Sequence, residues 1–448
     1  MMPRQDVPPR QAWTITGLIA VLMIINFLDK VVLGLVAVPM MAELRLTPVQ
    51  FGLIGGSLHW LYAVAAVGGG LLANRLPARW LLLGMALLWS VVQLPLIFTQ
   101  AMWLLIVCRV LLGVGEGPAT PIATHAIYKW FPDHQRSLPV ALIHQGSALG
   151  LLTGGLLIPL ISHHWGWRTN FALLALVGFV WAGVWLLMGA EGRGGDKPAV
   201  GLPAPTAVRS IPYARLLTDP TILGNYISHF GANWVLGVVL VWLPSYLQKG
   251  LGYDGVAAGK LFALFVLLTL PVSLGLAWLS QHLLRRGWTS RRARGMLSAS
   301  ALVLAGMALL AATLLDLPGL ARFALLACGT GLTSVVFSIG PAMLGEIVPT
   351  NQRAAVLSMS VVFTSLAGFL SPLVSGVLLQ ATGTAGVTGY DRVFMVAGGV
   401  ILACGVLLWR TAHPQQASRR LADGGSYTAS LSIQAPHERR HPPPLDIA

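Results

Sequence analysis

The sequence has few charged residues. Only 10% of its 448 residues are Asp, Glu, Lys or Arg, whereas 55% are hydrophobic, and the mean hydropathy is +0.73. A soluble globular chain carries about 25% charged residues, so this chain lacks the polar surface that a water-soluble protein needs. The composition predicts an integral membrane protein.

Cysteine is scarce as well. The three cysteines, Cys108, Cys328 and Cys404, all lie in apolar stretches, so neither a disulfide framework nor a metal cluster is indicated. The apolar stretches contain no evident metal-ligand spacing and no nucleophile–base set, so we expect no cofactor and no enzymatic activity. The first apolar run is longer than a signal-peptide core and lacks a cleavage site, which predicts a permanent span.

Long apolar segments are what the sequence does contain. A bilayer core about 30 Å thick needs about 20 residues in helical form, and strands cannot leave their edges unpaired in lipid. We therefore predict an all-α integral membrane protein with twelve transmembrane helices in two pseudo-repeated halves. The predicted helices cover roughly 13–41, 50–73, 80–99, 102–129, 137–162, 169–190, 220–248, 256–281, 295–315, 319–347, 354–380 and 390–410.

The two halves resemble each other. A Pro-x-x-Gln-Arg pattern that begins at Pro132, after the fourth helix, recurs at Pro349, after the tenth, with an offset of 217 residues. Two six-helix halves joined by a polar linker are typical of secondary transporters. The predicted divisions are an N-terminal segment 1–12, a first bundle 13–190, a linker 191–219, a second bundle 220–410 and a disordered tail 411–448.

The positive charges indicate an orientation. Fourteen Lys and Arg lie in loops after even-numbered helices and five after odd-numbered ones, and the two ends add seven on the even-loop side. Because positive loops remain in the cytoplasm, both termini are predicted to be cytoplasmic. The formal charge of +14 is therefore attributed to the positive loops that set the orientation in the membrane, and no nucleic-acid partner is expected.

Few charged residues lie deep within the predicted helices. Asp29 and Glu116 are the acids among fifteen, and Lys30, Arg109 and Lys260 are the bases among twenty-nine. A charge at mid-membrane costs roughly 2.5–3.5 kcal/mol, so these groups must face a protein interior or a wet cavity. Lys260 lies near the end of its helix and is expected to reach the interface.

The spacing of these charges suggests a binding site. Arg109 and Glu116 are seven residues apart, so they lie on one helix face about 10.5 Å apart along the axis, with the small Gly113 leaving space between them. Asp29 and Lys30 are adjacent and point in different directions. We predict two cation–carboxylate sets on opposite walls of one cavity.

Two interpretations of these charges remain. They could be internal salt bridges that fix helix register, although such bridges are often no better than apolar packing. In the functional interpretation, which we favour, the buried carboxylates bind protons because burial disfavours their charged form. The cations then bind an organic anion.

Other polar residues are weaker candidates. Tyr62 could donate a hydroxyl to a substrate, and the second half could line the cavity with Ser334, Phe337, Ser360 and Thr364. The histidines at 59, 125, 144 and 229 could relay protons, but packing is the favoured interpretation of each. Glycines spaced by four at 146, 150 and 154, and Gly368 with Gly376, predict close helix contacts.

Four stretches give the sequence a resemblance to a known family. Over 13–410 it resembles the major facilitator superfamily, and its first half resembles the anion:cation symporter family of galactonate, hexuronate, phthalate and sialin-type transporters. The stretches are Asn26-Phe27-Leu28-Asp29-Lys30, then Arg109 to Gly113 with Glu116-Gly117-Pro118 and Pro121, then Trp130-Phe131-Pro132 with Arg136, and Gly166-Trp167-Arg168.

This resemblance implies roles for individual residues. Asp29 and Glu116 would take up the driving protons, and Arg109 would support Glu116 or the anion. The implied substrate contacts are Lys30, Tyr62, Gln145 and Ser147. The implied gating residues are Asn74, Arg75, Arg79, Arg136 and Arg353. In three respects the sequence departs from the expected pattern: Lys30 replaces an arginine, Asn74 and Pro77 replace an aspartate and a glycine of the gate, and the glycine-rich segment 146–155 lacks the antiporter proline.

The sequence therefore predicts a proton-coupled symporter. It would import a small organic anion, such as a sugar acid or another carboxylate, by alternating access in a bacterial inner membrane, as a monomer. The main alternative is a proton-driven exporter of drugs or metabolites, although Lys30 and Arg109 favour an anion over a lipophilic cation. A membrane sensor or an intramembrane enzyme is a third class, for which no attached signalling domain or nucleophile–base set is seen.

Overall fold

The computed structural model describes residues 9–73, 75–132, 135–192, 211–349, 351–382 and 387–423. All regular structure in these ranges is helical, and twelve helical segments are long and apolar enough to cross a membrane. The predicted fold class is confirmed. In the first half the helices are α1 (Pro9–Leu35), α2 (Ala37–Leu44), α3 (Pro48–Ser57), α4 (Tyr62–Ala73), α5 (Ala78–Gln93), α6 (Met102–Glu116), α7 (Ala119–Tyr128), α8 (Ser137–Trp165) and α9 (Arg168–Met188).

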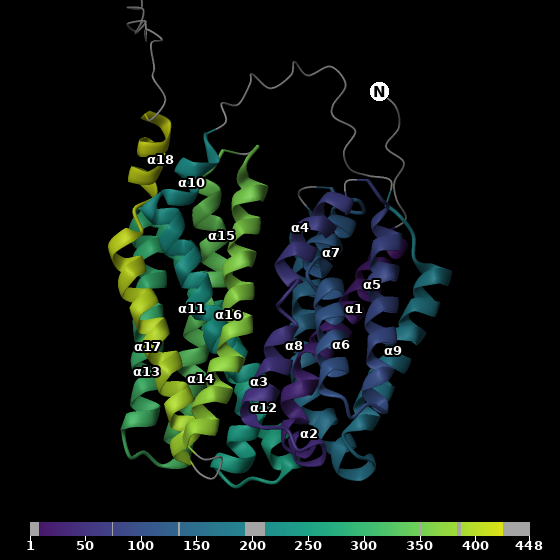
Figure 1. Ribbon diagram of the computed structural model, residues 1–448. Helices are drawn as coiled ribbons and strands as arrows, with labels where there is room; N and C mark the ends of the chain where they lie inside the picture. Colours follow the sequence, from purple (N-terminus) through teal and green to yellow (C-terminus); the bar gives the residue numbers. More distant parts are fainter. Residues whose placement is uncertain are drawn as a thin grey trace, which may run out of the picture.

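The second half is built from the remaining helices. They are α10 (Tyr213–Thr218), α11 (Pro220–Ser245), α12 (Gly255–Arg285), α13 (Leu297–Leu314), α14 (Gly319–Thr333), α15 (Val335–Ile347), α16 (Arg353–Thr382), α17 (Val387–Thr411) and α18 (Pro414–Asp423). Figure 1 shows the two halves side by side, with the start of α1, α10 and α18 at one end of the bundle and α2 at the other. We refer to these as the α18 end and the α2 end.

Three of the spans are divided into two α-helices. The second span breaks between α3 and α4, the fourth between α6 and α7, and the tenth at Ser334 between α14 and α15. Pro118 explains the second of these breaks, because proline has no N–H to continue the helix. Pro121 lies in the first turn of α7, where proline is tolerated. The fourth span is therefore broken immediately after Glu116.

The repeat seen in the sequence is also structural. The Arg136 guanidinium donates to the Tyr128 carbonyl oxygen (3.0 Å), and that of Arg353 donates to the Gly345 carbonyl oxygen (2.6 Å). Both acceptors precede their arginine by eight residues, at the carboxyl ends of α7 and α15. Each arginine thus satisfies a carbonyl group that a helix end leaves without an intrahelical partner.

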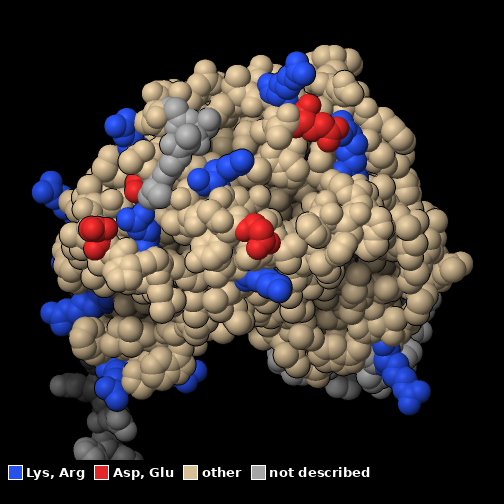
Figure 2. Space-filling model, turned by 90° about the horizontal axis from the view of Figure 1, so that it is seen from below, with Lys and Arg blue, Asp and Glu red and all other residues tan. Residues whose placement is uncertain are grey.

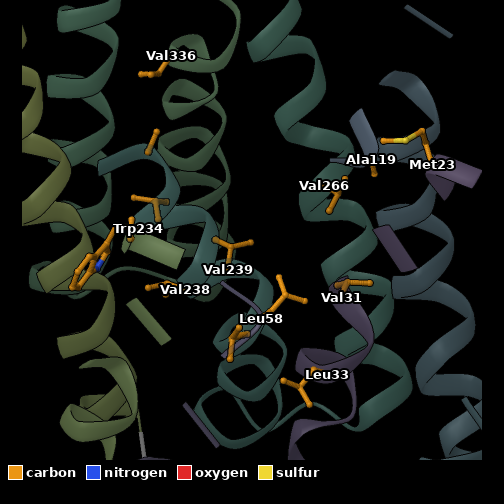
Figure 3. Packing of buried hydrophobic residues seen from close by; sticks show 14 of the residues in the cluster. Met23, Val31, Leu33, Leu58, Ala119, Trp234, Val238, Val239, Val266 and Val336 are labelled. Carbon is orange, nitrogen blue, oxygen red and sulfur yellow. The ribbon is translucent and has the colours of Figure 1, made fainter. Parts of the chain in front are cut away.

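Apolar packing continues through both halves. One cluster of buried residues contains Val31 and Leu33 of α1 together with Val238 and Val239 of α11 (Figure 3).

The glycines at four-residue spacing on α8 have the predicted packing role. A Cβ at Gly150 would lie 2.6 Å from the Ile24 carbonyl oxygen, so α8 can approach α1 only because this position lacks a side chain.

The two halves are in closest contact at the α2 end. A Cβ at Gly376 of α16 would lie 2.3 Å from the Pro48 carbonyl oxygen of α3, and one at Gly259 of α12 would lie 2.3 Å from the Gly155 carbonyl oxygen of α8. At the α18 end, α7 packs on α1, α4, α5 and α8, and α15 packs on α11, α12 and α18. A hollow of about 400 Å³ lined by Tyr128, Arg136, Ser137 and Val140 opens there. The halves are therefore closed together at the α2 end.

The α2 end is held by the loop that contains Trp167 and Arg168. Glu43 accepts a hydrogen bond from the Trp167 indole (2.6 Å) and pairs with Arg168. These two hydrogen bonds, with the Trp167 bond the stronger influence, lower the pKa of Glu43 from its ordinary value. Gly166 has φ +83°, a conformation that favours glycine. Figure 2 views this end and shows charged side chains scattered over a mostly uncharged surface.

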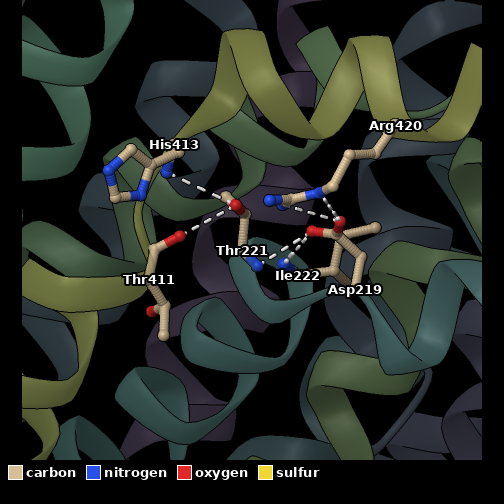
Figure 4. Close-up of polar contacts among 6 residues, drawn as sticks. All are labelled: Asp219, Thr221, Ile222, Thr411, His413 and Arg420. Carbon is tan, nitrogen blue, oxygen red and sulfur yellow. Dashed lines mark hydrogen bonds and ion pairs between the residues drawn. The ribbon is translucent and has the colours of Figure 1, made fainter.

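Part of the predicted disordered tail is helical. Helix α18 buries Ala417 and Leu421, and the Arg420 guanidinium pairs with Asp219 (2.9 Å). Asp219 also accepts hydrogen bonds at the start of α11, from the backbone N–H groups of Thr221 (2.8 Å) and Ile222 (3.4 Å) (Figure 4). The prediction of disorder is therefore wrong for 414–423, because polar composition does not reveal a short helix that docks on a partner surface. Residues 424–448 lie outside the described ranges.

Candidate functional site

The buried charges of the first half form one cluster. Asp29 of α1, Arg109 of α6 and Glu116 at the end of α6 are each at most 3% exposed. Gln93 of α5 donates to Asp29 Oδ1 (2.8 Å), and the Arg109 guanidinium donates to the Asp29 backbone carbonyl oxygen (3.2 Å). Three spans therefore converge on Asp29.

Lys30 connects this cluster to Glu116. Its ammonium lies 3.6 Å from Glu116 Oε2 and donates to the Asn26 amide oxygen (2.9 Å). The same ammonium lies 4.4 Å from the Phe27 ring centroid and 5.7 Å from that of Tyr62, within the range of cation–π attraction. The Lys30 side chain is 14% exposed, whereas that of Glu116 is 0% exposed. Lys30 is therefore the member of the ion pair that solvent can reach.

The predicted arrangement of two sets on opposite walls is wrong. Lys30 of α1 pairs with Glu116 of α6, and Arg109 reaches back to the backbone of Asp29. The space expected at Gly113 is also occupied, because a Cβ there would lie 1.8 Å from the Leu58 carbonyl oxygen. The broken turn of the second span fills this position.

Several polar atoms of the cluster have no hydrogen-bond partner among the described residues. They include both carboxylate oxygens of Glu116 and Nε of Arg109. A buried polar group without a partner costs about 1–3 kcal/mol. A carboxylate without a hydrogen-bond donor can accept a proton, and a guanidinium with a free N–H can bind an anion.

The predicted residues of the second half have mixed environments. Phe337 is 41% exposed, and its ring centroid lies 6.0 Å from that of His229. The hydroxyl groups of Ser334 and Thr364 donate to backbone carbonyl oxygens of their own helical segments (2.6 and 3.0 Å), a common use of such groups in membrane helices. On α8, Gln145 is exposed and Ser147 half-buried. The structure does not join these five residues to the charged cluster.

Sequence reasoning missed a polar stripe on α11. Asn225, His229 and Asn233 are spaced by four and therefore share one helix face. The Asn225 amide donates to the Gly340 carbonyl oxygen (3.3 Å), and the Asn233 amide donates to that of Thr364 (2.6 Å). Polar residues at four-residue spacing in an apolar span were a visible signal for this stripe.

Three of the predicted gating residues, Arg79, Arg136 and Arg353, form hydrogen bonds within their own halves. The Arg79 guanidinium donates to the Leu186 carbonyl oxygen (2.9 Å), and Arg75 is exposed. Arg136 and Arg353 make the helix-end bonds described above. Asn74 lies outside the described residues. A gating role at the α18 end stays a prediction, because the halves meet at the opposite end.

Glu191 connects three spans at the α18 end. It accepts hydrogen bonds from the backbone N–H groups of Ala78 (3.2 Å) and Arg79 (2.9 Å) at the start of α5, and from the Lys129 ammonium (2.5 Å) after α7. Partial burial by itself would raise the pKa of Glu191, but these hydrogen bonds, that of Lys129 foremost, lower it below the ordinary value of 4.5.

Replacing Glu191 with Gln should destabilise the first half. We expect the free energy of unfolding to fall by about 1 kcal/mol, because the charge-assisted hydrogen bonds of a partly exposed carboxylate are removed. Because the pKa of Glu191 is lowered in the folded state, its contribution to stability is present above the ordinary pKa. The contribution disappears as the pH falls through the pKa of the folded state. Thermal unfolding at about pH 7 and pH 4 would measure it, with Asp316→Asn as the control, because that carboxylate is exposed. Equal unfolding temperatures at neutral pH would contradict the role.

Comparisons with known proteins agree with this architecture. A family model described as Major Facilitator Superfamily matches residues 19–339. The chain is similar to a sodium-dependent phosphate transport protein of Arabidopsis thaliana, with 27% identity over 90% of this chain and 79% of that protein. It is also similar to a hexuronate transporter of Bacillus subtilis, with 26% identity over 87% of this chain and 92% of that protein.

Solved structures share the fold. A bacterial homologue of the human lysosomal transporter Spinster, solved inward-facing and unoccupied, superposes with a TM-score of 0.72 at 17% identity, over 94% of this chain and 100% of that one. The family match spans more than half of the chain and includes the charged cluster and the first of the two repeated loops. The chain therefore belongs to the Major Facilitator Superfamily, and it is a multi-pass membrane transporter rather than an enzyme.

Proposed function

We propose that the protein couples the movement of a small organic anion to that of a proton in the same direction. The observation that carries this proposal is the Lys30–Glu116 contact. The ammonium is partly exposed, whereas the carboxylate is fully buried and accepts no hydrogen bond from any described residue. Lys30 is therefore the group that an entering anion can reach, and Glu116 is the group that loses its counterion when the anion binds.

The charge balance of the cluster links the two events. Asp29 and Glu116 offset Lys30 and Arg109, so the cluster is neutral when all four are ionised. A monovalent anion adds one negative charge, which is costly in a buried site. A proton on Glu116 restores neutrality. The cluster therefore favours the transport of one proton with each monovalent anion, and the transport of either ion alone is unfavourable.

The proposed substrate class is a carboxylate with further polar groups, such as a sugar acid. Lys30 provides a point charge rather than a planar fork, which suits a carboxylate without demanding bidentate geometry. Asn233 of the polar stripe of α11 is half-buried and would offer its amide to substrate hydroxyls, whereas Asn225 and His229 are buried. The name of the hexuronate transporter supports a sugar acid, whereas that of the phosphate transport protein raises phosphate as substrate and sodium as coupling ion.

The alternative is a proton-driven exporter of drugs or metabolites. Lipophilic cations would favour carboxylates without nearby cations. Here each carboxylate has one: Lys30 lies beside Glu116, and Arg109 is bonded to the Asp29 backbone. The anion symporter is therefore preferred.

Alternating access would use the two halves as rocking units. We propose that the α18 end is cytoplasmic, because the loops at that end hold most of the Lys and Arg residues, and that the membrane is a bacterial inner membrane. The closed α2 end would then be the outer side. The close glycine contacts at that end would separate when the site opens outward.

A thermal-shift screen would test the proposed function. Purified protein would be heated with sugar acids, other carboxylates, phosphate and lipophilic cations at about pH 5.5 and 7.5, with and without sodium. Binding to the folded state raises the unfolding temperature. We expect stabilisation by one class of carboxylates, greater at the lower pH, independent of sodium and lost in Arg109→Ala. Stabilisation by lipophilic cations alone would favour the exporter, and a sodium requirement would replace the proton as coupling ion.

A further inference from the structure

The contact between the halves runs along α3 and α16. A Cβ at Gly52 would lie 2.4 Å from the Pro372 carbonyl oxygen, and one at Gly56 would lie 2.5 Å from the Phe369 carbonyl oxygen. The Trp60 ring continues this contact, with its centroid 6.0 Å from that of Phe369. Because the glycines have no side chains, the two helices approach to backbone contact. They form a seal between the halves.

His59 ends this seal on the side of the charged cluster. Its ring lies against α16, where a Cβ at Gly368 would be 2.5 Å from the imidazole Cδ2 and Nε2 atoms. Its other neighbour is Tyr62, at a ring-centroid distance of 5.5 Å, and the Tyr62 ring in turn lies 5.7 Å from Lys30 Nζ. His59 Nδ1 is buried and has no hydrogen-bond partner among the described residues. This one side chain therefore lies between the cluster of one half and the backbone of the other.

The broken second span fixes the position of His59. In the turn between α3 and α4, the His59 N–H donates to the Gly56 carbonyl oxygen (2.9 Å) and the Trp60 N–H to that of Ser57 (3.1 Å). The preceding Leu58 carbonyl oxygen lies where a Cβ at Gly113 would be, at 1.8 Å. The turn thus packs on α6, the helix that carries Arg109 and Glu116. A movement of α6 would be transmitted directly to His59.

We propose that His59 is the positioning residue that closes the seal, and that it does so as a neutral imidazole. The proposal rests on the proposed transport function, because a seal that opens has meaning only in alternating access. In the closed state Nδ1 has no acceptor among the described residues, and only the Tyr62 ring is placed between the imidazole and the Lys30 ammonium. Tyr62 faces the imidazole from α4, the carboxylates of Asp29 and Glu116 offset the cations Lys30 and Arg109, and α16 has no titratable side chain after Arg353.

The closure of the seal should depend on pH. When the seal opens, the imidazole leaves Gly368 and meets the outer medium, where histidine ordinarily titrates at about pH 6.5. An imidazolium returning to the closed position would add a third positive charge beside Lys30 and Arg109. Because such a charge would be buried without a partner, the protonated form holds the seal open.

A cysteine reporter tests the steric part of this proposal. Val241 of α11 lies inside the contact, because a Cβ at Gly55 would be 3.0 Å from its Cγ1 atom. In a Val241→Cys protein whose three native cysteines are replaced by alanine, maleimide labelling in detergent reports opening without any substrate. Gly368→Ala should raise the labelling rate about tenfold, because overpacking costs more than about 1 kcal/mol. Adding His59→Ala should restore the slow rate.

The control for this experiment is Gly399→Ala on α17, where a Cβ would meet nothing within 4 Å. It should leave the labelling rate unchanged. An unchanged rate in Gly368→Ala, or a raised rate that His59→Ala does not restore, overturns the proposal. Neither result depends on the substrate or on proton coupling, so it is distinct from a failure of the proposed function.

A pH series tests the protonation part without altering Gly368. The labelling rate of the Val241→Cys protein is divided by that of the same protein carrying His59→Gln, which cancels the reactivity of the thiol. We expect this ratio to rise several-fold between about pH 7.5 and pH 5.5, because only the imidazole can gain a charge. A ratio that is the same at both pH values means that His59 only packs, and it overturns this part of the proposal.

Discussion

Replacing Glu116 with Gln should leave substrate exchange intact and abolish accumulation driven by a proton gradient. Glutamine keeps the shape of the side chain but cannot bind a proton, so the anion can still displace the neutral group from Lys30. For one proton per monovalent anion, a gradient of one pH unit supports about tenfold accumulation, since that gradient corresponds to 1.36 kcal/mol. In Glu116→Gln the ratio should fall to about one.

Proteoliposomes would separate these two activities. Counterflow of labelled substrate reports exchange, and uptake under an imposed pH gradient reports coupling. Glu346→Gln is a suitable control, because Glu346 pairs with Arg294 at the α18 end of the second half, away from the cluster. Equal loss of exchange and accumulation in Glu116→Gln would show that the residue serves folding or binding and not coupling.

Lys30→Ala should produce the second large effect, a loss of anion affinity. Removing one partner of a desolvated charge pair costs about 2 kcal/mol or more, which corresponds to an increase in Kd of roughly thirtyfold. The anion loses its accessible cation, and this loss accounts for the expected value.

Titration of the carboxylate identified in the thermal-shift screen would measure this loss. Lys260→Ala is the matched control, because that lysine is exposed on α12 and should not affect affinity. Lys30→Arg should retain more binding than Lys30→Ala, since it keeps the charge. Unchanged affinity in both Lys30→Ala and Arg109→Ala would remove the binding assignment from this cluster.

Some features of the site were predictable because they depend on composition and helix geometry. Charge is so scarce in the spans that Asp29, Lys30, Arg109 and Glu116 could be selected directly. The helical repeat placed Arg109 and Glu116 on one face. Neither property depends on how helices pack, so the structure retains both.

The pairing of these charges could not be predicted in the same way. Lys30 meets Glu116, and Arg109 bonds to the Asp29 backbone, because tertiary packing sets the position and rotation of α1 relative to α6. The position of α6 in turn depends on backbone contacts such as that of Gly113 with the Leu58 carbonyl oxygen of the second span. A glycine in a sequence does not indicate whether it leaves a space or admits another backbone.

The sequence by itself determined the membrane class, the twelve spans, the duplicated loop and the candidate charges, because hydropathy and repeats are properties of local composition. Only the tertiary structure decided which charges touch, that α18 docks on Asp219, and that His59 lies between the cluster and Gly368. These contacts join residues far apart in the chain. Their geometry is set by helix packing, in which a shift of a single side-chain width changes the partner.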